Sequence, residues 1–297
     1  MSMLLMSSGD QPIINWSFLG GALSSGISFS RASTGWKTNS SGILESVAEN
    51  GLRFDHNPIT HLVSGLIIEE QKQNLLTYSS DYTQSVWTKA SSSISSSSIV
   101  APNGSTMQKV TAGSSSFPGI RQYFTATPLA TYTASIYAKY STQQYFYIVS
   151  SNSSQYTVFD LLNGTIKSKY TGATPSITPV GGGIYRCSVP FVVPSGVTSA
   201  IIQYNFGQYS SDTHSGEEIY LWGAQIESGL TMTSHIPTTA STVTRAADIA
   251  QFTIPRGVNT LRYTLDDNST QDIAVSMGLH TVPTTLTRTT IRRIHSI

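Results

Sequence analysis

Apolar and polar residues alternate in short runs along most of this chain, and clusters of Gly, Pro, Asn and Ser separate the runs. Residues two apart lie on the same face of a strand, whereas a helix repeats every three to four residues. The pattern therefore predicts an all-β protein built as a sandwich or a barrel. We expect its clearest strands to cover residues 132–140, 145–150, 184–193, 200–206 and 218–226.

A β-hairpin is the sharpest local prediction. Two alternating segments, 156–161 and 165–170, flank the dipeptide Asn163-Gly164. Both central residues of a type I′ turn need positive φ, which Asn and Gly adopt at low cost. The sequence thus predicts a two-residue type I′ turn between these strands.

Helical spacing is almost absent from the chain. Only residues 67–76 could form a short helix or turn, and the end of this segment fits a strand equally well. The serine-rich stretch 91–98 fits a loop or a polar edge strand. Near the C-terminus, Ile291, Ile294 and Ile297 are spaced three apart, so they could line a short helix or an extended arm.

The pattern divides the chain into three regions. Residues 1–65 are interpreted as an N-terminal arm and first strands joined to the sandwich, and residues 66–245 as the sandwich itself. Residues 246–297 form a small β module with a C-terminal arm. A module of about 50 residues buries too little surface to be very stable alone, so we expect it to dock on its neighbour or to oligomerise.

The segment 219–245 is the most informative stretch of the sequence. It begins as a strand with Tyr220 and Trp222 on one face, turns, and continues as an extended arm anchored by Pro237. A large aromatic side chain on such a strand usually contributes to the core. We therefore expect Trp222 to pack in the sandwich rather than to contact a ligand.

Composition narrows the class of protein. Charged residues make up 11% of the chain, against about 25% in ordinary soluble domains, so the surface is mostly hydroxyls and amides. A net charge of +1 gives no broad field for nucleic acid or an anionic membrane. No apolar run is long enough to span a membrane, and residues 1–6 lack the basic start of a secretory signal. The single cysteine, Cys187, excludes an internal disulfide and is expected to be buried.

Aromatic residues are the candidates for ligand binding. The chain holds 15 tyrosines and 4 tryptophans, and ligand sites are commonly lined by such rings together with a few polar groups. The candidate ligand-binding residues are Tyr145, Tyr147, Tyr156 and Tyr209. The alternative is that these rings fill the core of the sandwich, with their hydroxyls at its rim.

Several motifs of the chain resemble a known family. In order they are similar to segments of bacteriophage head-fibre and tail-accessory structural proteins, and the likeness spans most of the sequence. The motifs are Phe29-Ser30-Arg31-Ala32-Ser33-Thr34, Gly51-Leu52-Arg53-Phe54-Asp55-His56, Gly65-Leu66-Ile67-Ile68-Glu69-Glu70-Gln71, Trp222-Gly223-Ala224-Gln225-Ile226-Glu227 and Arg245-Ala246-Ala247-Asp248.

The resemblance implies a jelly-roll β-sandwich similar to carbohydrate-binding modules, made in the host cytoplasm and assembled into the virion as a homotrimer. The expected function is that of a non-enzymatic head fibre or tail-associated spike. Its partners would be other virion proteins of the capsid or tail and a host-surface polysaccharide. The alternative is a decoration or adaptor protein that clamps neighbouring subunits without binding sugar.

The acidic residues argue against catalysis. A glycosidase needs two carboxylates about 5–10 Å apart, and the spacing of Glu69, Glu70, Asp160 and Glu227 favours no such pair. We therefore expect neither a catalytic site nor an organic cofactor.

Metal binding has little support in the sequence. Asp55, His56 and His61 match no zinc spacing, and a turn with a surface histidine explains them better. Jelly rolls often hold a structural calcium ion, for which Asp212, Glu217 and Glu218 are candidate ligands.

Overall fold

The structure is a computed structural model that describes residues 14–150, 155–208 and 213–297. This part of the chain is all-β, as predicted, and none of it is a helix that could cross a membrane. Contacts divide the chain into two compact units, which are described separately. The sandwich unit comprises Gly42–Leu44 and Lys72–Arg245, and the split unit comprises Met1–Ser41, Glu45–Gln71 and Ala246–Ile297.

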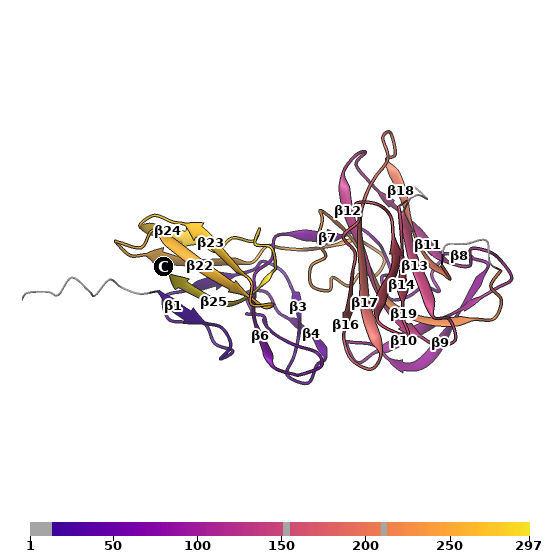
Figure 1. Ribbon diagram of the computed structural model, residues 1–297, viewed down its shortest axis with the longest axis horizontal. Helices are drawn as coiled ribbons and strands as arrows, with labels where there is room; N and C mark the ends of the chain where they lie inside the picture. Colours follow the sequence, from indigo (N-terminus) through magenta and orange to yellow (C-terminus); the bar gives the residue numbers. More distant parts are fainter. Residues whose placement is uncertain (1–13, 151–154, 209–212) are drawn as a thin grey trace, which may run out of the picture. The chain divides into compact units, whose positions relative to one another are not determined.

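The sandwich unit is a jelly-roll β-sandwich of two antiparallel six-stranded sheets, visible as two layers in Figure 1. The first sheet has the order β16-β17-β12-β19-β10-β9. Its strands are β9 (Ser92–Val100), β10 (Thr106–Ala112), β12 (Thr131–Tyr140), β16 (Ser176–Pro179), β17 (Ile184–Val192) and β19 (Glu218–Ser228).

The second sheet of the sandwich unit has the order β15-β14-β13-β18-β11-β8. It consists of β8 (Thr88–Ala90), β11 (Gly119–Thr125), β13 (Tyr145–Ser150), β14 (Tyr156–Asp160), β15 (Thr165–Lys169) and β18 (Ser199–Phe206). A short ribbon of β7 (Lys72–Asn74) and β20 (Val243–Arg245) lies where the chain enters and leaves the unit.

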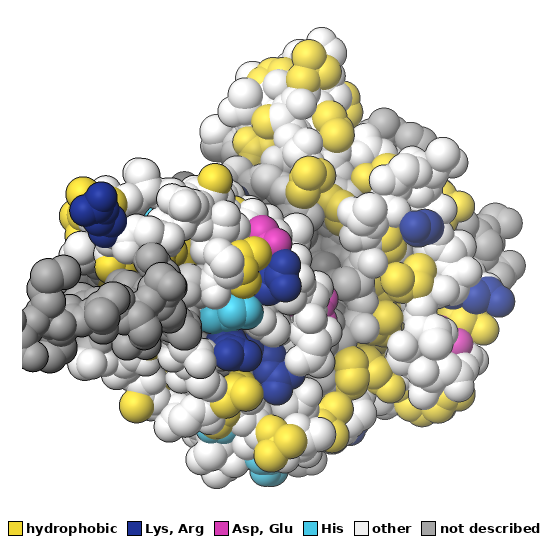
Figure 2. All heavy atoms as spheres, turned by 60° about the vertical axis from the view of Figure 1, so that its left-hand side comes forward, with side chains coloured by type: hydrophobic (Ala, Val, Ile, Leu, Met, Phe, Trp, Pro, Cys, Tyr) yellow, Lys and Arg dark blue, Asp and Glu magenta, His cyan; other side chains and the backbone are white. Residues whose placement is uncertain are grey.

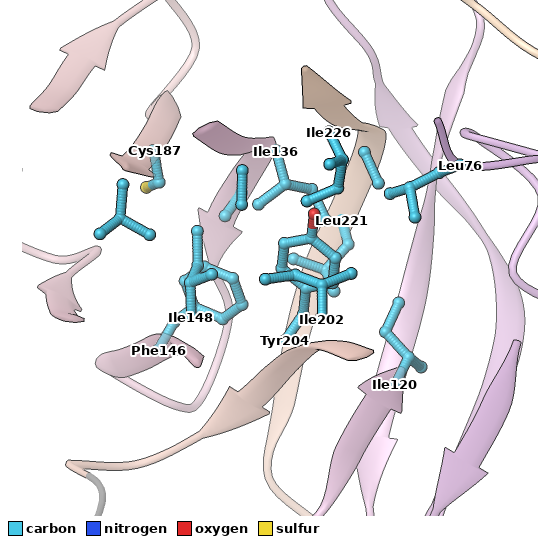
Figure 3. Packing of buried hydrophobic residues seen from close by; sticks show 14 of the residues in the cluster. Leu76, Ile120, Ile136, Phe146, Ile148, Cys187, Ile202, Tyr204, Leu221 and Ile226 are labelled. Atoms are coloured by element: carbon cyan, nitrogen blue, oxygen red, sulfur yellow. The ribbon is translucent and has the colours of Figure 1, made fainter. Parts of the chain in front are cut away.

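Alternate residues of both sheets meet in one apolar core. Ile136, Leu221 and Cys187 project from the first sheet toward Phe146 and Ile202 of the second (Figure 3), and all five are buried. Cys187 is therefore buried as predicted, and burial raises the pKa of its thiol. The alternation seen in the sequence is thus the alternation between this core and the two outer faces.

All five long strands predicted from the sequence are confirmed as β12, β13, β17, β18 and β19. The serine-rich stretch is strand β9 at the edge of its sheet, the second of the two alternatives. Its exposed serines suit an edge that faces water.

The predicted hairpin is present, but the predicted type I′ turn is wrong. Strands β14 and β15 pair from Asp160 to Thr165, which leaves four residues in the loop, and only Gly164 of the Asn163-Gly164 dipeptide has positive φ. The Asp160 carboxylate accepts hydrogen bonds from the backbone N–H groups of Leu162 and Asn163 at 3.1 and 3.0 Å. This side-chain cap stabilises a longer loop than the dipeptide alone predicts.

The arm predicted after β19 returns along the outer face of the first sheet. Gln225 holds it through its Oε1, which accepts from the Ile236 N–H at 2.8 Å, and through its Nε2, which donates to the Ser234 carbonyl at 3.2 Å. The buried Glu227 carboxylate accepts from the Thr233 N–H at 3.0 Å. Beneath the arm, the buried His235 ring lies 4.5 Å from the ring of Trp222.

The split unit is assembled from both ends of the chain. Its larger sheet has the order β23-β22-β25-β6-β5, with β1 also paired to β25, and its smaller sheet has the order β2-β21-β24. The strands are β1 (Asn15–Ser17), β2 (Ser28–Ser30), β5 (Phe54–His56), β6 (Val63–Ile67), β21 (Ile249–Ile254), β22 (Thr260–Leu265), β23 (Thr270–Ala274), β24 (Gly278–Thr281) and β25 (Thr290–Ser296), and β3 (Gly35–Thr38) pairs with β4 (Leu44–Val47).

The structure decides the conformation of two segments for which the sequence allowed either a helix or an extended chain. Residues 67–76 hold the end of β6 and all of β7, so they form strands rather than a helix. Ile291 and Ile294 lie in strand β25 and are buried in the core of the split unit. The regions 1–65 and 246–297, which the sequence sets apart, thus share one core in this unit.

Four buried charges form a network inside the split unit. Arg53 donates to Glu69 at 2.7 Å and also bonds Asp248, while Arg31 reaches Asp248 at 3.2 Å. All four side chains are almost fully buried. The backbone N–H of Glu69 donates to the Asp248 carboxylate at 2.8 Å, so the network ties the N-terminal and C-terminal segments together.

These four charges come from four of the motifs on which the family resemblance rests. Arg31 also donates to the backbone carbonyls of Val47, Ala48 and Gly51. Gly35 allows this packing, because a Cβ there would lie 2.9 Å from Arg53 Cδ. The structure therefore explains the charged residues of these motifs. A buried charge is stable only when ion pairs and hydrogen bonds replace its contacts with water.

Candidate functional site

The outer face of the second sheet of the sandwich unit is the candidate site. On β13, Phe146 and Ile148 enter the core, so Tyr145 and Tyr147 point to the opposite face. The same alternation on its neighbours places further side chains beside them. We call the resulting surface the tyrosine face and define it by Arg121 and Tyr123 of β11, Tyr145 and Tyr147 of β13, Tyr156 of β14, and Gln203 and Asn205 of β18.

The structure brings together three of the four predicted ligand-binding residues. Tyr145, Tyr147 and Tyr156 share one small cluster with Val149 and Val158, separate from the sandwich core. Tyr209 lies outside the described residues. These three rings therefore do not lie in the core between the sheets, which was the alternative.

The three tyrosines differ in what they offer a ligand. Tyr147 is only 1% exposed, and its hydroxyl accepts a hydrogen bond from Asn205 Nδ2 at 3.1 Å. Tyr145 and Tyr156 are half-buried. The Lys167 ammonium of β15 lies 5.7 Å from the centre of the Tyr145 ring, a cation–π contact that covers part of it. Tyr147 therefore supports the face from below, while its neighbours reach the surface.

The most accessible ring of the face is Tyr123, which is 62% exposed. Arg121 lies two residues before it on the same side of β11 and pairs in register with Gln203. Neither the Arg121 guanidinium nor the Gln203 amide bonds another described residue. An exposed ring next to free donors and acceptors can stack on a sugar and bind its hydroxyl groups.

Sequence reasoning missed this end of the site. Residues 119–125 carry a signal, because Ile120 and Phe124 alternate with the polar Arg121 and with Tyr123 around a β-favouring run. The start of this strand is hard to recognise, because it begins with Gly119 and follows the serine-rich residues 114–116. The register with β18 could not be read from the chain, since it depends on pairing between two strands that are far apart in the sequence.

The other aromatic candidates are structural. Trp222 is buried, as expected, but it packs on the outer side of the first sheet against Tyr137 rather than between the two sheets. Tyr220 belongs to the same cluster. The arm described above covers this face, so Trp222 is not available to a ligand.

The candidate metal ligands do not converge. In the described residues, no three His, Cys, Asp or Glu side chains are placed to hold a metal ion. The Asp55 carboxylate accepts from the Thr38 N–H at 2.7 Å, and burial raises the pKa of this group. Glu218 pairs with Lys109 at 2.8 Å, and Glu217 bonds the Ser215 N–H, while Asp212 lies outside the described residues.

The acidic residues that were considered for catalysis have structural partners. Glu69 belongs to the buried charge network, Asp160 caps the hairpin loop, and Glu227 holds the arm. Burial raises the pKa of Glu227, although the hydrogen bonds from Thr233 act in the opposite direction. These carboxylates stabilise three separate elements rather than one cleft.

Comparison with known proteins finds matches among solved structures but not among family models or curated proteins. No model of a protein family matches the chain, and no curated protein matches it. Among solved structures, the enzymatically active domain of tailspike protein 4 from bacteriophage CBA120 is similar at 17% identity and a TM-score of 0.33. A protein from Bacteroides thetaiotaomicron with a proposed sugar-binding role is similar at 9% identity and a TM-score of 0.29.

Both matches cover 52% of this chain. They cover 21% of the tailspike chain and 94% of the Bacteroides protein, so the match spans about a fifth of the tailspike protein's length. The resemblance to phage head-fibre and tail-accessory proteins therefore rests on the sequence motifs, whose buried charges are described above.

Proposed function

We propose that this chain is a non-enzymatic structural protein of a phage particle, a head fibre or tail-associated spike, whose tyrosine face binds glycans on the host surface. The observation that carries the proposal is the exposed Tyr123 ring beside Arg121 and Gln203, whose polar groups have no partner in the described chain. The motif resemblance supports the virion setting, with other virion proteins as partners and a homotrimer as the assembly.

The surface composition supports the same reading. Figure 2 shows one face of the molecule, on which a small number of charged side chains lie among hydrophobic side chains and a larger area of uncharged polar side chains and backbone. With 11% charged residues, the chain relies on hydroxyls and amides for its contact with water. Such groups match the hydrogen-bonding pattern of sugar hydroxyls.

The variant Tyr123→Ala tests the proposal. We expect its affinity for host-surface glycans, measured on a glycan array and by binding to host cells, to fall about tenfold, because the ring supplies the main stacking surface. The matched control is Tyr220→Ala on the outer face of the other sheet, which should bind as the wild type does. Absence of binding to any glycan or host cell by the wild-type protein would refute the proposal.

A second candidate, a decoration or adaptor protein that binds no sugar, is favoured by a different surface. In the split unit, Met277 immediately precedes the edge strand β24 and is 70% exposed, and Leu279 within this strand is 73% exposed. Exposed apolar side chains at a sheet edge suit contact with another subunit.

The double variant Met277→Ser/Leu279→Ser distinguishes this candidate. If the edge clamps a neighbouring subunit, the variant should fold normally and lose attachment to the particle, as seen by sedimentation with assembled particles. A deletion after Ala246 would be a poor test, since it removes β21 to β25 and with them most of the core of the split unit. Unchanged attachment of the double variant would exclude this edge as the clamp.

A further inference from the structure

The sheet that carries the tyrosine face has an unequal charge. Its six strands contain four basic residues and one acidic residue, Asp160. The basic residues are Lys89, Arg121, Lys167 and Lys169. In a chain with a net charge of only +1, this excess is local.

The single acid of the sheet is not available to balance these cations. Both Asp160 oxygens accept hydrogen bonds within the hairpin and its neighbour, from the backbone of Leu162 and Asn163, from Asn163 Nδ2 at 2.8 Å and from Gln144 Nε2 at 2.9 Å. Its side chain is buried. The exposed part of the face is therefore cationic.

Two of the four cations are already engaged. Lys89 donates to the carbonyls of Thr83 and Gln84 at 2.8 and 2.7 Å, and Lys169 donates to the carbonyl of Ala173 at 2.8 Å. Arg121 and Lys167 have no hydrogen bond or ion pair in the described chain. Lys167 instead lies over the Tyr145 ring, which holds its ammonium at the tyrosine face.

The two free cations lie on opposite sides of the face. Strands β14, β13 and β18 separate β15, which carries Lys167, from β11, which carries Arg121. Four spacings between neighbouring strands place them roughly 19 Å apart across the sheet. One small anion cannot reach both, whereas an extended chain that crosses the strands can.

We propose that the ligand of the tyrosine face is an anionic oligosaccharide that crosses the strands, with acidic groups bound by Arg121 and Lys167. This inference rests on the glycan-binding function proposed above. The Arg121 guanidinium can bind a carboxylate or sulfate through two parallel hydrogen bonds, and Lys167 adds a point charge. Tyr123 lies beside Arg121 on β11, and Gln203 lies on β18, between β11 and β15. In this arrangement both residues contact the neutral part of the sugar.

The test uses the full-length protein and pairs of probes that differ only in charge. The first pair is an oligogalacturonate and its fully methyl-esterified form, and the second is dextran sulfate and unmodified dextran. We expect calorimetry at low salt to show at least about tenfold tighter binding to the anionic member of one pair, and the two pairs distinguish carboxylate from sulfate. The preference should shrink as salt is raised.

Two variants and a control locate the effect. Arg121→Gln should weaken binding to the anionic probe about tenfold and Lys167→Gln several-fold, with little effect on the neutral form. The matched control is Arg256→Gln, which removes an exposed arginine from the split unit and should change nothing. Unchanged thermal unfolding shows that the variants are folded.

The other outcomes overturn the inference in distinguishable ways. Equal binding of the charged and neutral members, weakened in both by Tyr123→Ala, would overturn the anionic ligand and leave the glycan-binding function standing. Equally tight binding of poly-glutamate would show that charge alone is recognised, which also overturns it. Binding to no probe, and to no glycan on the array, would refute the proposed function together with the inference.

Discussion

Replacement of Arg53 by methionine is expected to destabilise the split unit by about 3–5 kcal/mol, because it leaves buried carboxylates without their main partner. Arg53 bonds both Glu69 and Asp248, and its side chain is fully buried. Although burial alone would lower the pKa of Arg53, the two carboxylates raise it, so the residue stays charged in the folded protein. Methionine fills the space and supplies no charge.

Hydrogen–deuterium exchange with mass spectrometry can measure this effect in each unit separately. Peptides from β5, β22 and β25 should lose protection in the variant, while peptides from the sandwich unit serve as an internal reference. The matched control is Arg262→Met, since Arg262 makes a two-bond pair with Asp272 at the surface, where both partners are more than a third exposed. We expect the control to cost at most about 1 kcal/mol.

A compensating variant sharpens the interpretation. Adding Glu69→Gln to Arg53→Met removes one of the unpaired charges and should recover part of the lost stability. Equal protection in wild type and Arg53→Met would contradict the role that we assign to the network. So would an equal loss in Arg53→Met and Arg262→Met.

Acidification from pH 7 to pH 5 is expected to destabilise the sandwich unit by about 2 kcal/mol through His235 alone. Burial, with a smaller contribution from Arg186, lowers the pKa of His235 from 6.5 to about 3. Between these two values the unfolded chain binds a proton that the folded chain does not. Stability therefore falls as pH decreases through this window, and the full contribution is present only above about pH 6.5.

Glu227 lies in the same region and acts in the opposite direction. Burial raises the pKa of its carboxyl group, so its contribution to stability is present at low pH and is lost as pH rises through the folded-state pKa. The His235 effect must therefore be isolated by a difference. The variant His235→Gln retains the Glu227 effect, so its change in stability between pH 7 and pH 5 should differ from that of the wild type by about 2 kcal/mol, in the direction of less acid destabilisation.

Urea unfolding at several pH values measures this difference, with hydrogen exchange assigning it to the sandwich unit. The comparison uses the change in the free energy of unfolding with pH. A loss of stability in His235→Gln that is the same at every pH therefore does not affect it. The control His61→Asn replaces an exposed histidine at positive φ by a residue that tolerates it, and should leave the slope unchanged. Parallel curves for wild type and His235→Gln would contradict the prediction.

The sequence predicted the all-β fold and the long strands because alternation is a local signal. It also predicted that Tyr145, Tyr147 and Tyr156 could act together, and their shared face follows from spacing within β13 and pairing with β14. It did not predict Tyr123, which joins them through β18, a strand far along the chain. Local patterns place a residue on a face of a strand, whereas only the register between distant strands decides its neighbours.

Two further errors have local physical causes. The Asn163-Gly164 dipeptide suggested a tight turn, but the Asp160 side chain caps the backbone and favours a longer loop. Trp222 was expected inside the sandwich and lies on its outer side, because the returning arm creates a second buried layer there. Neither the cap nor the arm's position alters the hydrophobic pattern on which the predictions depended.

The ribbon of β7 and β20 makes the sandwich segment of this protein exchangeable. Lys72 pairs with Arg245 and Asn74 with Val243, so the chain enters and leaves the sandwich unit through neighbouring strands about 5 Å apart. Any domain whose two ends lie equally close could occupy this position without a change in the rest of the chain. Under the proposed function, recombination at these two points would change host specificity in one event, while the charge network of the split unit, encoded outside the exchanged segment, would be inherited intact.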